Sequence, residues 1–230
     1  MMPVDSEIQR RNRALIAFTL LTGARDSAIA SMKLGHVDLA AGSIYQDARD
    51  VKTKFSKSFT TYFFQVGTDV RGIVEDWVKY LRHEKLWGNE GPLFPATETG
   101  VNASGNFEAS GLKPEHWRNA APIRGIFREA FTRANLPYFN PHSFRDTLVQ
   151  LAETRCRTPE EFKAWSQNLG HERVLTTLYS YGAVATSRQG QIIASLADVR
   201  QAEVPLVSQI ADLVRQIIRD DPQDGRRRDA

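Results

Sequence analysis

A histidine and an arginine stand three residues apart in the segment Asn140-Pro141-His142-Ser143-Phe144-Arg145. Asn140 is a favourable helix N-cap and Pro141 suits the first helical position, so the segment predicts the start of a helix. His142 and Arg145 would then share one face of the first turn, at a helix end whose dipole and N–H groups favour an anion. The spacing therefore predicts a phosphate site, although a surface histidine and arginine at an ordinary helix start would show the same pattern.

A second pattern combines a histidine with tyrosines downstream of it. His171 closes the segment Leu169-Gly170-His171, and Tyr181 follows ten residues later, with Tyr179 two residues before it. A phenol, whose pKa is about 10, is a poor nucleophile unless positive groups stabilise the charge that develops during attack. Taken alone, the pattern also fits a helix-capping histidine followed by half-buried aromatic side chains.

Further basic residues occur where the chain is predicted to turn. Arg25 follows Thr22-Gly23-Ala24, between the predicted end of one helix and the start of the next. Lys54 and Lys57 lie in a polar segment that suggests a hairpin turn. Such side chains can reach a bound ligand, but arginines are more often solvated or ion-paired, and hairpin lysines often only protect an edge strand.

The order and spacing of these motifs resemble those of the tyrosine recombinase (phage integrase) family, over about residues 10 to 185. The resemblance implies an enzyme that cuts and rejoins DNA through a covalent 3′-phosphotyrosine link. By the same likeness, Arg25 and Arg145 grip the scissile phosphate. His142 handles protons and binds the phosphate, and His171 hydrogen-bonds the same phosphate.

The resemblance also assigns the two groups that make and break the bond. Lys54 would be the general acid on the leaving 5′ oxygen, and Tyr181 would be the nucleophile. The covalent link conserves the bond energy, so resealing needs no ATP, and arginines and histidines supply the stabilisation that a metal ion would give. No cofactor is therefore expected. The expected partner is double-stranded DNA, on which the chain would associate with itself as a tetramer.

The sequence departs from the family pattern at three places. The family usually places its tyrosine nine residues after the second histidine, where this chain has Ser180, so Tyr181 is favoured and Tyr179 stays as an alternative. Ala28 stands where the family commonly has Glu or Asp, so another group, for which Asp26 is a candidate, must orient Arg25. The pattern TKxxKS resembles the family's TKTGKS and favours Lys54 over Lys57.

The elements that must position these residues follow from apolar periodicity and turn residues. They predict a mainly helical α+β domain with a small antiparallel sheet in its N-terminal third. Predicted helices cover residues 13–21, 26–34, 69–83, 122–134, 142–154, 159–168 and 203–219. Predicted strands cover residues 43–46, 50–53 and 60–66, and the Gly-, Ser-, Asn- and Thr-rich stretch 96–110 is predicted to be a long surface loop.

Composition sets wider bounds on the chain. Its 230 residues, 41% of them hydrophobic, suffice for a sizeable core, and a single cysteine excludes a disulfide within the chain. The net charge of +3 permits nucleic-acid binding without requiring it. The polar N-terminus has no apolar signal core, and no apolar run approaches the roughly 20 residues of a membrane span. A cytoplasmic location is therefore expected.

The predicted organisation is a catalytic domain over residues 1–202, a C-terminal helix over 203–219 and a flexible tail over 220–230. The apolar stripe of that helix predicts packing either on a neighbouring subunit or on its own domain. Family members usually carry an N-terminal helical domain that clamps the other side of the DNA, and this sequence begins at the catalytic core. Low affinity for DNA is expected, since many phosphate contacts would be missing.

Other functions are compatible with the same motifs. A type IB topoisomerase or a telomere resolvase would share the chemistry and differ in assembly. The displaced tyrosine and Ala28 also leave room for a catalytically silent DNA-binding relative or a helical interaction module.

Overall fold

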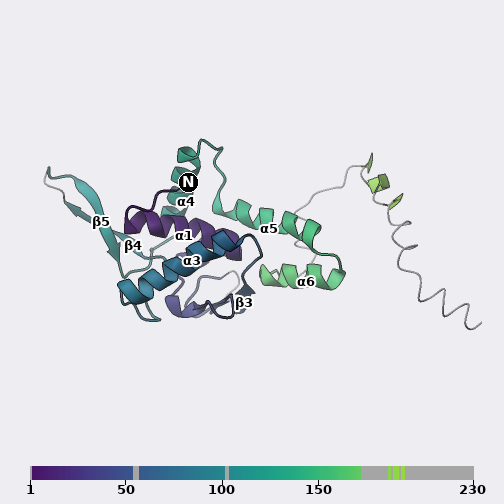
Figure 1. Cartoon of the computed structure of the whole chain (residues 1–230), viewed down its shortest axis with the longest axis horizontal. Helices are drawn as coiled ribbons and strands as arrows, with labels where there is room; N and C mark the ends of the chain where they lie inside the picture. The colour runs from purple at the N-terminus through teal and green to yellow at the C-terminus, as the bar shows by residue number, and fades with distance from the viewer. Residues whose placement is uncertain are drawn as a thin grey trace, which may run out of the picture. The chain divides into compact units, whose positions relative to one another are not determined.

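The computed structural model describes residues 2–53, 57–101 and 104–171, together with the short stretches 186–187, 189–191 and 193–194. The chain divides into two compact units, Met1–Ser180 and Tyr181–Ala230. All elements named below belong to the first unit, which combines helices with two small antiparallel sheets (Figure 1). The predicted α+β class is confirmed. The predicted helix 203–219 and tail 220–230 lie outside the described residues.

Two helices form the centre of the first unit and run side by side (Figure 1): α1, Glu7–Thr22, and α3, Thr68–Lys79. A capping box between Ser6 and Gln9 starts α1, six residues before the predicted start. This first part was not predicted because its residues are mostly polar. One of them, Arg11, is nevertheless buried, with its guanidinium over the ring of Trp117 and a hydrogen bond to the carbonyl of Pro95 (2.9 Å).

The three-stranded sheet follows the first helices and has the order β1-β2-β3, all antiparallel. Its strands are β1, Val37–Asp38, β2, Ser43–Gln46, and β3, Phe59–Tyr62. The strand predicted over 50–53 is wrong, because the N–H groups of Asp50 and Val51 both bond to the carbonyl of Asp47 and close a turn. The strand predicted over 60–66 ends at residue 62.

A second sheet replaces the long loop predicted over 96–110, so that prediction is wrong. Strands β4, Ala96–Val101, and β5, Phe107–Lys113, pair as an antiparallel hairpin that extends away from the helices (Figure 1). Both faces of the hairpin are exposed toward its tip, where Phe107 is 84% exposed. Backbone pairing rather than burial therefore stabilises the hairpin. Because neither face is buried toward the tip, the sequence there has no alternating apolar pattern.

The remaining helices lie close to their predicted positions, with one exception. They are α4, Ala121–Arg133, α5, Pro141–Arg155, and α6, Pro159–Asn168. The exception is the helix predicted over 26–34, which is only the single turn α2, Asp26–Ile29, followed by the 3₁₀ turn η1, Leu34–His36. At the end of α3, a π-helical turn, η3, covers Tyr80–Glu84. Within the described part of the chain, no helix is both long and apolar enough to cross a membrane.

Candidate active site

Helix α5 begins as predicted, with Asn140 as its N-cap and Pro141 at the first position. The side-chain oxygen of Asn140 accepts hydrogen bonds from the N–H groups of His142 (2.9 Å) and Ser143 (3.2 Å). Proline has no N–H, and Asn140 accepts from the N–H groups of the next two residues. The first three helical positions therefore offer no free backbone donor to an anion. Side chains, rather than the helix backbone, must therefore bind an anion here.

Arg145 lies in the first turns of α5 and is 4% exposed. Its Nη1 donates to the carbonyl of Gly23, and its Nη2 donates to the carbonyl of Leu169 (2.6 Å). Nη2 is also 3.1 Å from Nε2 of His171. Gly23 lies just before Arg25 in the chain, and Leu169 just before His171. One buried guanidinium thus joins three segments that are far apart in the sequence.

Two glycines allow this close approach. Gly23 ends α1 with a left-handed φ of 60°, and a Cβ there would lie 2.8 Å from Leu169 Cδ2 and 2.9 Å from Leu148 Cδ1. Gly170 has a φ of 69°, and a Cβ there would lie 2.6 Å from the ring of Phe59. Both positions combine a conformation and a spacing that only glycine tolerates well.

The end of α6 is held by strand β3 through Asn168. The side chain of Asn168 accepts from the N–H of Tyr62 (2.7 Å) and donates to its carbonyl (2.9 Å). The carbonyl of Asn168 accepts from the hydroxyl of Thr61 (3.0 Å). These contacts hold Asn168 against β3, directly before Leu169, and neither Asn168 nor Thr61 was predicted as a site residue. The signal that could have found Asn168 is its position directly before the Leu169-Gly170-His171 motif.

Arg25 lies between α1 and α2 and is half-buried. Among the described residues, none forms a hydrogen bond or ion pair with its guanidinium. Burial lowers the pKa of Arg25. Burial, and then the charge of Arg25, lower the pKa of Arg145 to about 9. A bound anion would offset both effects, because it would neutralise two like charges that burial has partly removed from water.

A cleft of about 440 Å³ opens beside Arg25, and His142 and Arg124 also line it. The side chain of His142 is 66% exposed, with its Nε2 3.9 Å from the carboxylate of Asp146. His142 and Arg145, predicted to share a face, therefore differ: the histidine faces solvent while the arginine is buried. The suggestion that Asp26 orients Arg25 is also wrong, because the carboxylate of Asp26 binds Arg124 Nε instead (2.9 Å).

The remaining predicted site residues are two lysines and two tyrosines, of which the structure describes one lysine. Lys54, Tyr179 and Tyr181 lie outside the described residues, whereas Lys57 is described and exposed. The backbone that leads to Lys54 is tied to α2. There, Ser31 Oγ accepts from the N–H of Lys52 (3.0 Å), and Ser27 Oγ donates to the carbonyl of Lys52 (3.3 Å). In the described ranges, no group of three His, Cys, Asp or Glu side chains is placed to hold a metal ion.

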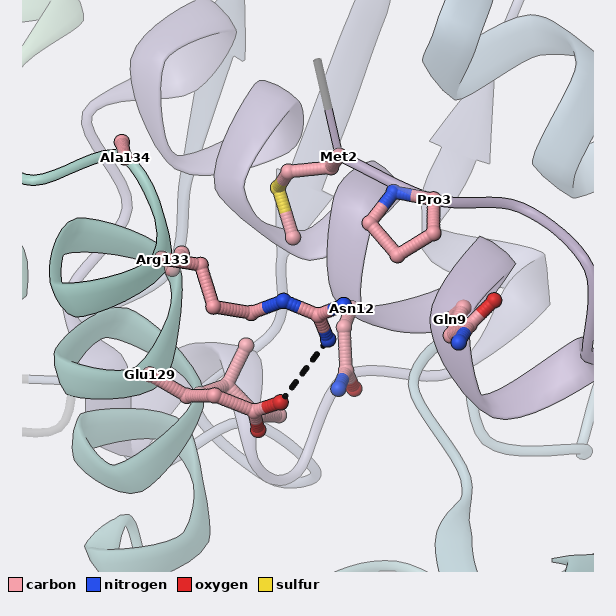
Figure 2. A pocket seen from close by; sticks show the side chains of 9 residues that line it. Met2, Pro3, Gln9, Asn12, Glu129, Arg133 and Ala134 are labelled. Atoms are coloured by element: carbon pink, nitrogen blue, oxygen red, sulfur yellow. Dashed lines mark hydrogen bonds and ion pairs between the residues drawn. The ribbon is translucent and has the colours of Figure 1, made fainter.

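A second cavity, of about 550 Å³, lies between the N-terminal segment, α1 and α4. Figure 2 shows its lining, in which Arg133 and Glu129 of α4 form an ion pair of 3.3 Å beside Asn12 of α1. None of the predicted site residues lines it. Of the predicted site residues, Arg25 and His142 line the cleft of about 440 Å³ instead.

No protein-family model matches the sequence, and no curated protein matches it as a relative. Among solved structures, the chain is similar to XerA recombinase, with a TM-score of 0.52 and 18% identity over 81% of this chain and 56% of that chain. It is also similar to the Tn1549 transposon integrase in complex with transposon right-end DNA, with a TM-score of 0.53 and 15% identity over 84% of this chain and 61% of that chain.

A second structure of the same integrase, in complex with circular-intermediate DNA, gives a TM-score of 0.51 and 16% identity over 84% of this chain and 62% of that chain. The match thus spans less than two thirds of the length of each of these proteins. The helices and small antiparallel sheets described above match theirs in arrangement. The chain therefore shares the fold of these recombinase and integrase structures over the matched region.

Proposed function

We propose that this chain performs site-specific recombination of double-stranded DNA by cutting and rejoining strands through a 3′-phosphotyrosine intermediate. The observation that carries the proposal is the buried Arg145, whose guanidinium joins the segments preceding Arg25 and His171. The similarity in fold to a recombinase and to a transposon integrase bound to DNA supports the same function.

In the proposed mechanism, Arg25, Arg145 and His171 bind the non-bridging oxygens of the scissile phosphate and stabilise the charge that builds up on them. The phenolic oxygen of Tyr181 attacks phosphorus and loses its proton, with His142 as the proton-handling group. The bond from phosphorus to the 5′ oxygen breaks, and Lys54 donates a proton to that oxygen. The 5′-hydroxyl of a second strand then attacks the phosphotyrosine and gives its proton to Lys54. The bond from phosphorus to the phenolic oxygen breaks, and His142 returns a proton to that oxygen.

Trapping of the covalent intermediate tests this proposal. A pool of nicked duplexes with randomised sequence around the nick lets the short 5′ fragment diffuse away after cleavage, so a protein–DNA adduct that resists SDS accumulates. We expect the wild-type chain and Tyr179→Phe to form the adduct and Tyr181→Phe to form none. If Tyr181→Phe forms the adduct and Tyr179→Phe does not, Tyr179 is the nucleophile and our assignment is wrong.

The choice between Lys54 and Lys57 has its own test. We expect Lys54→Ala to slow cleavage strongly and Lys57→Ala to have little effect. A substrate with sulfur in place of the leaving 5′ oxygen should restore the rate of Lys54→Ala, because a thiolate leaves without a proton. Rescue of Lys57→Ala instead would transfer the role of general acid to Lys57.

Recombination is favoured over topoisomerase activity because the solved structures of similar fold are a recombinase and integrases. Relaxation of supercoiled plasmid without any partner site would support the topoisomerase. A chain that binds DNA but never forms the adduct would be the catalytically silent relative.

Tetramer formation on DNA belongs to the same proposal. Residues 203–219 would pack on a neighbouring subunit, so removal of the residues after Ala202 should abolish self-association on DNA and leave the first unit folded. An unfolded deletion product would show that the segment instead packs on its own domain.

A further inference from the structure

Arg124 is a basic residue of the cleft that none of the motifs includes. It lies on α4 and lines the cleft of about 440 Å³ together with Arg25 and His142. Its side chain is 58% exposed, and its Nε donates to Oδ2 of Asp26 at 2.9 Å. The contact joins residues 98 positions apart in the sequence, so it depends on the fold and not on helix periodicity.

Asp26 uses both of its carboxylate oxygens in this arrangement. Oδ2 accepts from Arg124 Nε, and Oδ1 accepts from the N–H of Ser27 (2.8 Å). Its charge is therefore balanced by Arg124. A carboxylate without such a partner, placed directly after Arg25 in the chain, would repel a phosphate that enters the cleft.

The same contact leaves the outer edge of the Arg124 guanidinium available. Among the described residues, none accepts a hydrogen bond from Nη1 or Nη2 of Arg124. An arginine held through Nε keeps its orientation and presents both Nη groups as a pair of parallel donors. That geometry matches two oxygens of one phosphate group.

We propose that Arg124 is a third arginine of the DNA site, which binds a backbone phosphate beside the scissile one, and that Asp26 is its positioning residue. This inference rests on the proposed function, because it takes DNA as the occupant of the cleft. Arg25 and Arg145 belong to the predicted motifs, whereas Arg124 belongs to none of them and lines the cleft from α4. Arg124 therefore contributes to DNA affinity and not to the bond-breaking step.

Arg133 provides a matched control on the same helix. Its side chain is 56% exposed, and its Nη1 lies 3.3 Å from Oε1 of Glu129, within the second cavity (Figure 2). Arg124→Gln and Arg133→Gln each remove one positive charge from an exposed, ion-paired arginine of α4. Only the first change affects the cleft that contains Arg25 and His142.

The experiment measures the affinity for a fluorescent DNA duplex by anisotropy over a range of salt concentrations. Loss of one phosphate contact should reduce the slope of log K against log salt by about 0.9. We expect this change for Arg124→Gln, with affinity at low salt weaker by about tenfold, and an unchanged slope for Arg133→Gln. Equal effects of the two variants would overturn the inference, because general charge would then explain both.

A double-mutant cycle tests the role given to Asp26. If Asp26 acts through Arg124, Asp26→Asn weakens DNA binding in the wild-type background. In the Arg124→Gln background the same change strengthens binding, because it removes an unpaired carboxylate that repels the phosphate. Additive losses would overturn the positioning role. Adduct formation by the wild-type chain reports on the proposed function separately. An adduct together with an unchanged salt slope for Arg124→Gln would therefore remove only the inference about Arg124.

Discussion

Replacement of Gly23 by alanine tests how tightly the segments around Arg145 are packed. Gly23 has a φ of 60°, and a non-glycine residue in this left-handed region costs about 1–2 kcal/mol. The new Cβ would also lie 2.8 and 2.9 Å from methyl groups of Leu169 and Leu148. Overpacking of this kind costs about 1–3 kcal/mol. The two effects together predict a loss of about 2–5 kcal/mol in the free energy of unfolding of Gly23→Ala.

Replacement of Gly42 by alanine separates the conformational cost from the packing cost. It has nearly the same φ, 62°, but a Cβ there would meet its nearest atom, Arg71 Nη1, at 3.5 Å, an ordinary contact. Gly42→Ala should therefore lose only the conformational part, about 1–2 kcal/mol. Urea unfolding of both variants measures the difference. Equal losses would refute the reasoning, since the packing against Leu148 and Leu169 would then contribute nothing.

Two further predictions concern contacts that hold the hairpin and the end of α6. Burial alone would raise the pKa of Glu7, but hydrogen bonds from Lys85, the N–H of Leu112 and Tyr80 outweigh it and lower the pKa. The stability from Glu7 is thus present above its unfolded pKa and lost as the pH falls through the lower folded value. Glu7→Gln should therefore lose about 1 kcal/mol at pH 7 and show a smaller decline toward pH 3 in urea unfolding, whereas a parallel decline would contradict this. Asn168→Asp keeps the acceptor for Tyr62 N–H but removes the donor to its carbonyl, so we expect a loss of about 1 kcal/mol in thermal or urea unfolding, and an unchanged stability would contradict the contact.

Much of the helical fold was predictable because its signals are local. The cap residues Asn140 and Thr158, each followed by a proline, mark the starts of α5 and α6, and the predicted bounds of α4, α5 and α6 differ from the structure by at most one residue. The hairpin of β4 and β5 was missed because exposed residues such as Phe107 replace an alternating apolar pattern.

The contacts around the candidate site were not predictable from the sequence. Arg145 binds the carbonyls of Gly23 and Leu169, and a backbone carbonyl is present at every position and leaves no signal in the sequence. The role predicted for Asp26 was wrong because its partner, Arg124, lies 98 residues away in the sequence and belongs to no motif.

A crystal structure with bound DNA would show whether Arg25, Arg145 and His171 bind the same phosphate group. The duplex would be a nicked one that forms the adduct, with orthovanadate in place of the scissile phosphate. We predict that oxygens of one vanadate lie within about 3 Å of the donors of Arg25, Arg145 and His171, with the oxygen of Tyr181 opposite the leaving 5′ oxygen. A vanadate bound elsewhere, or a guanidinium of Arg145 that contacts only the carbonyls of Gly23 and Leu169, would contradict it.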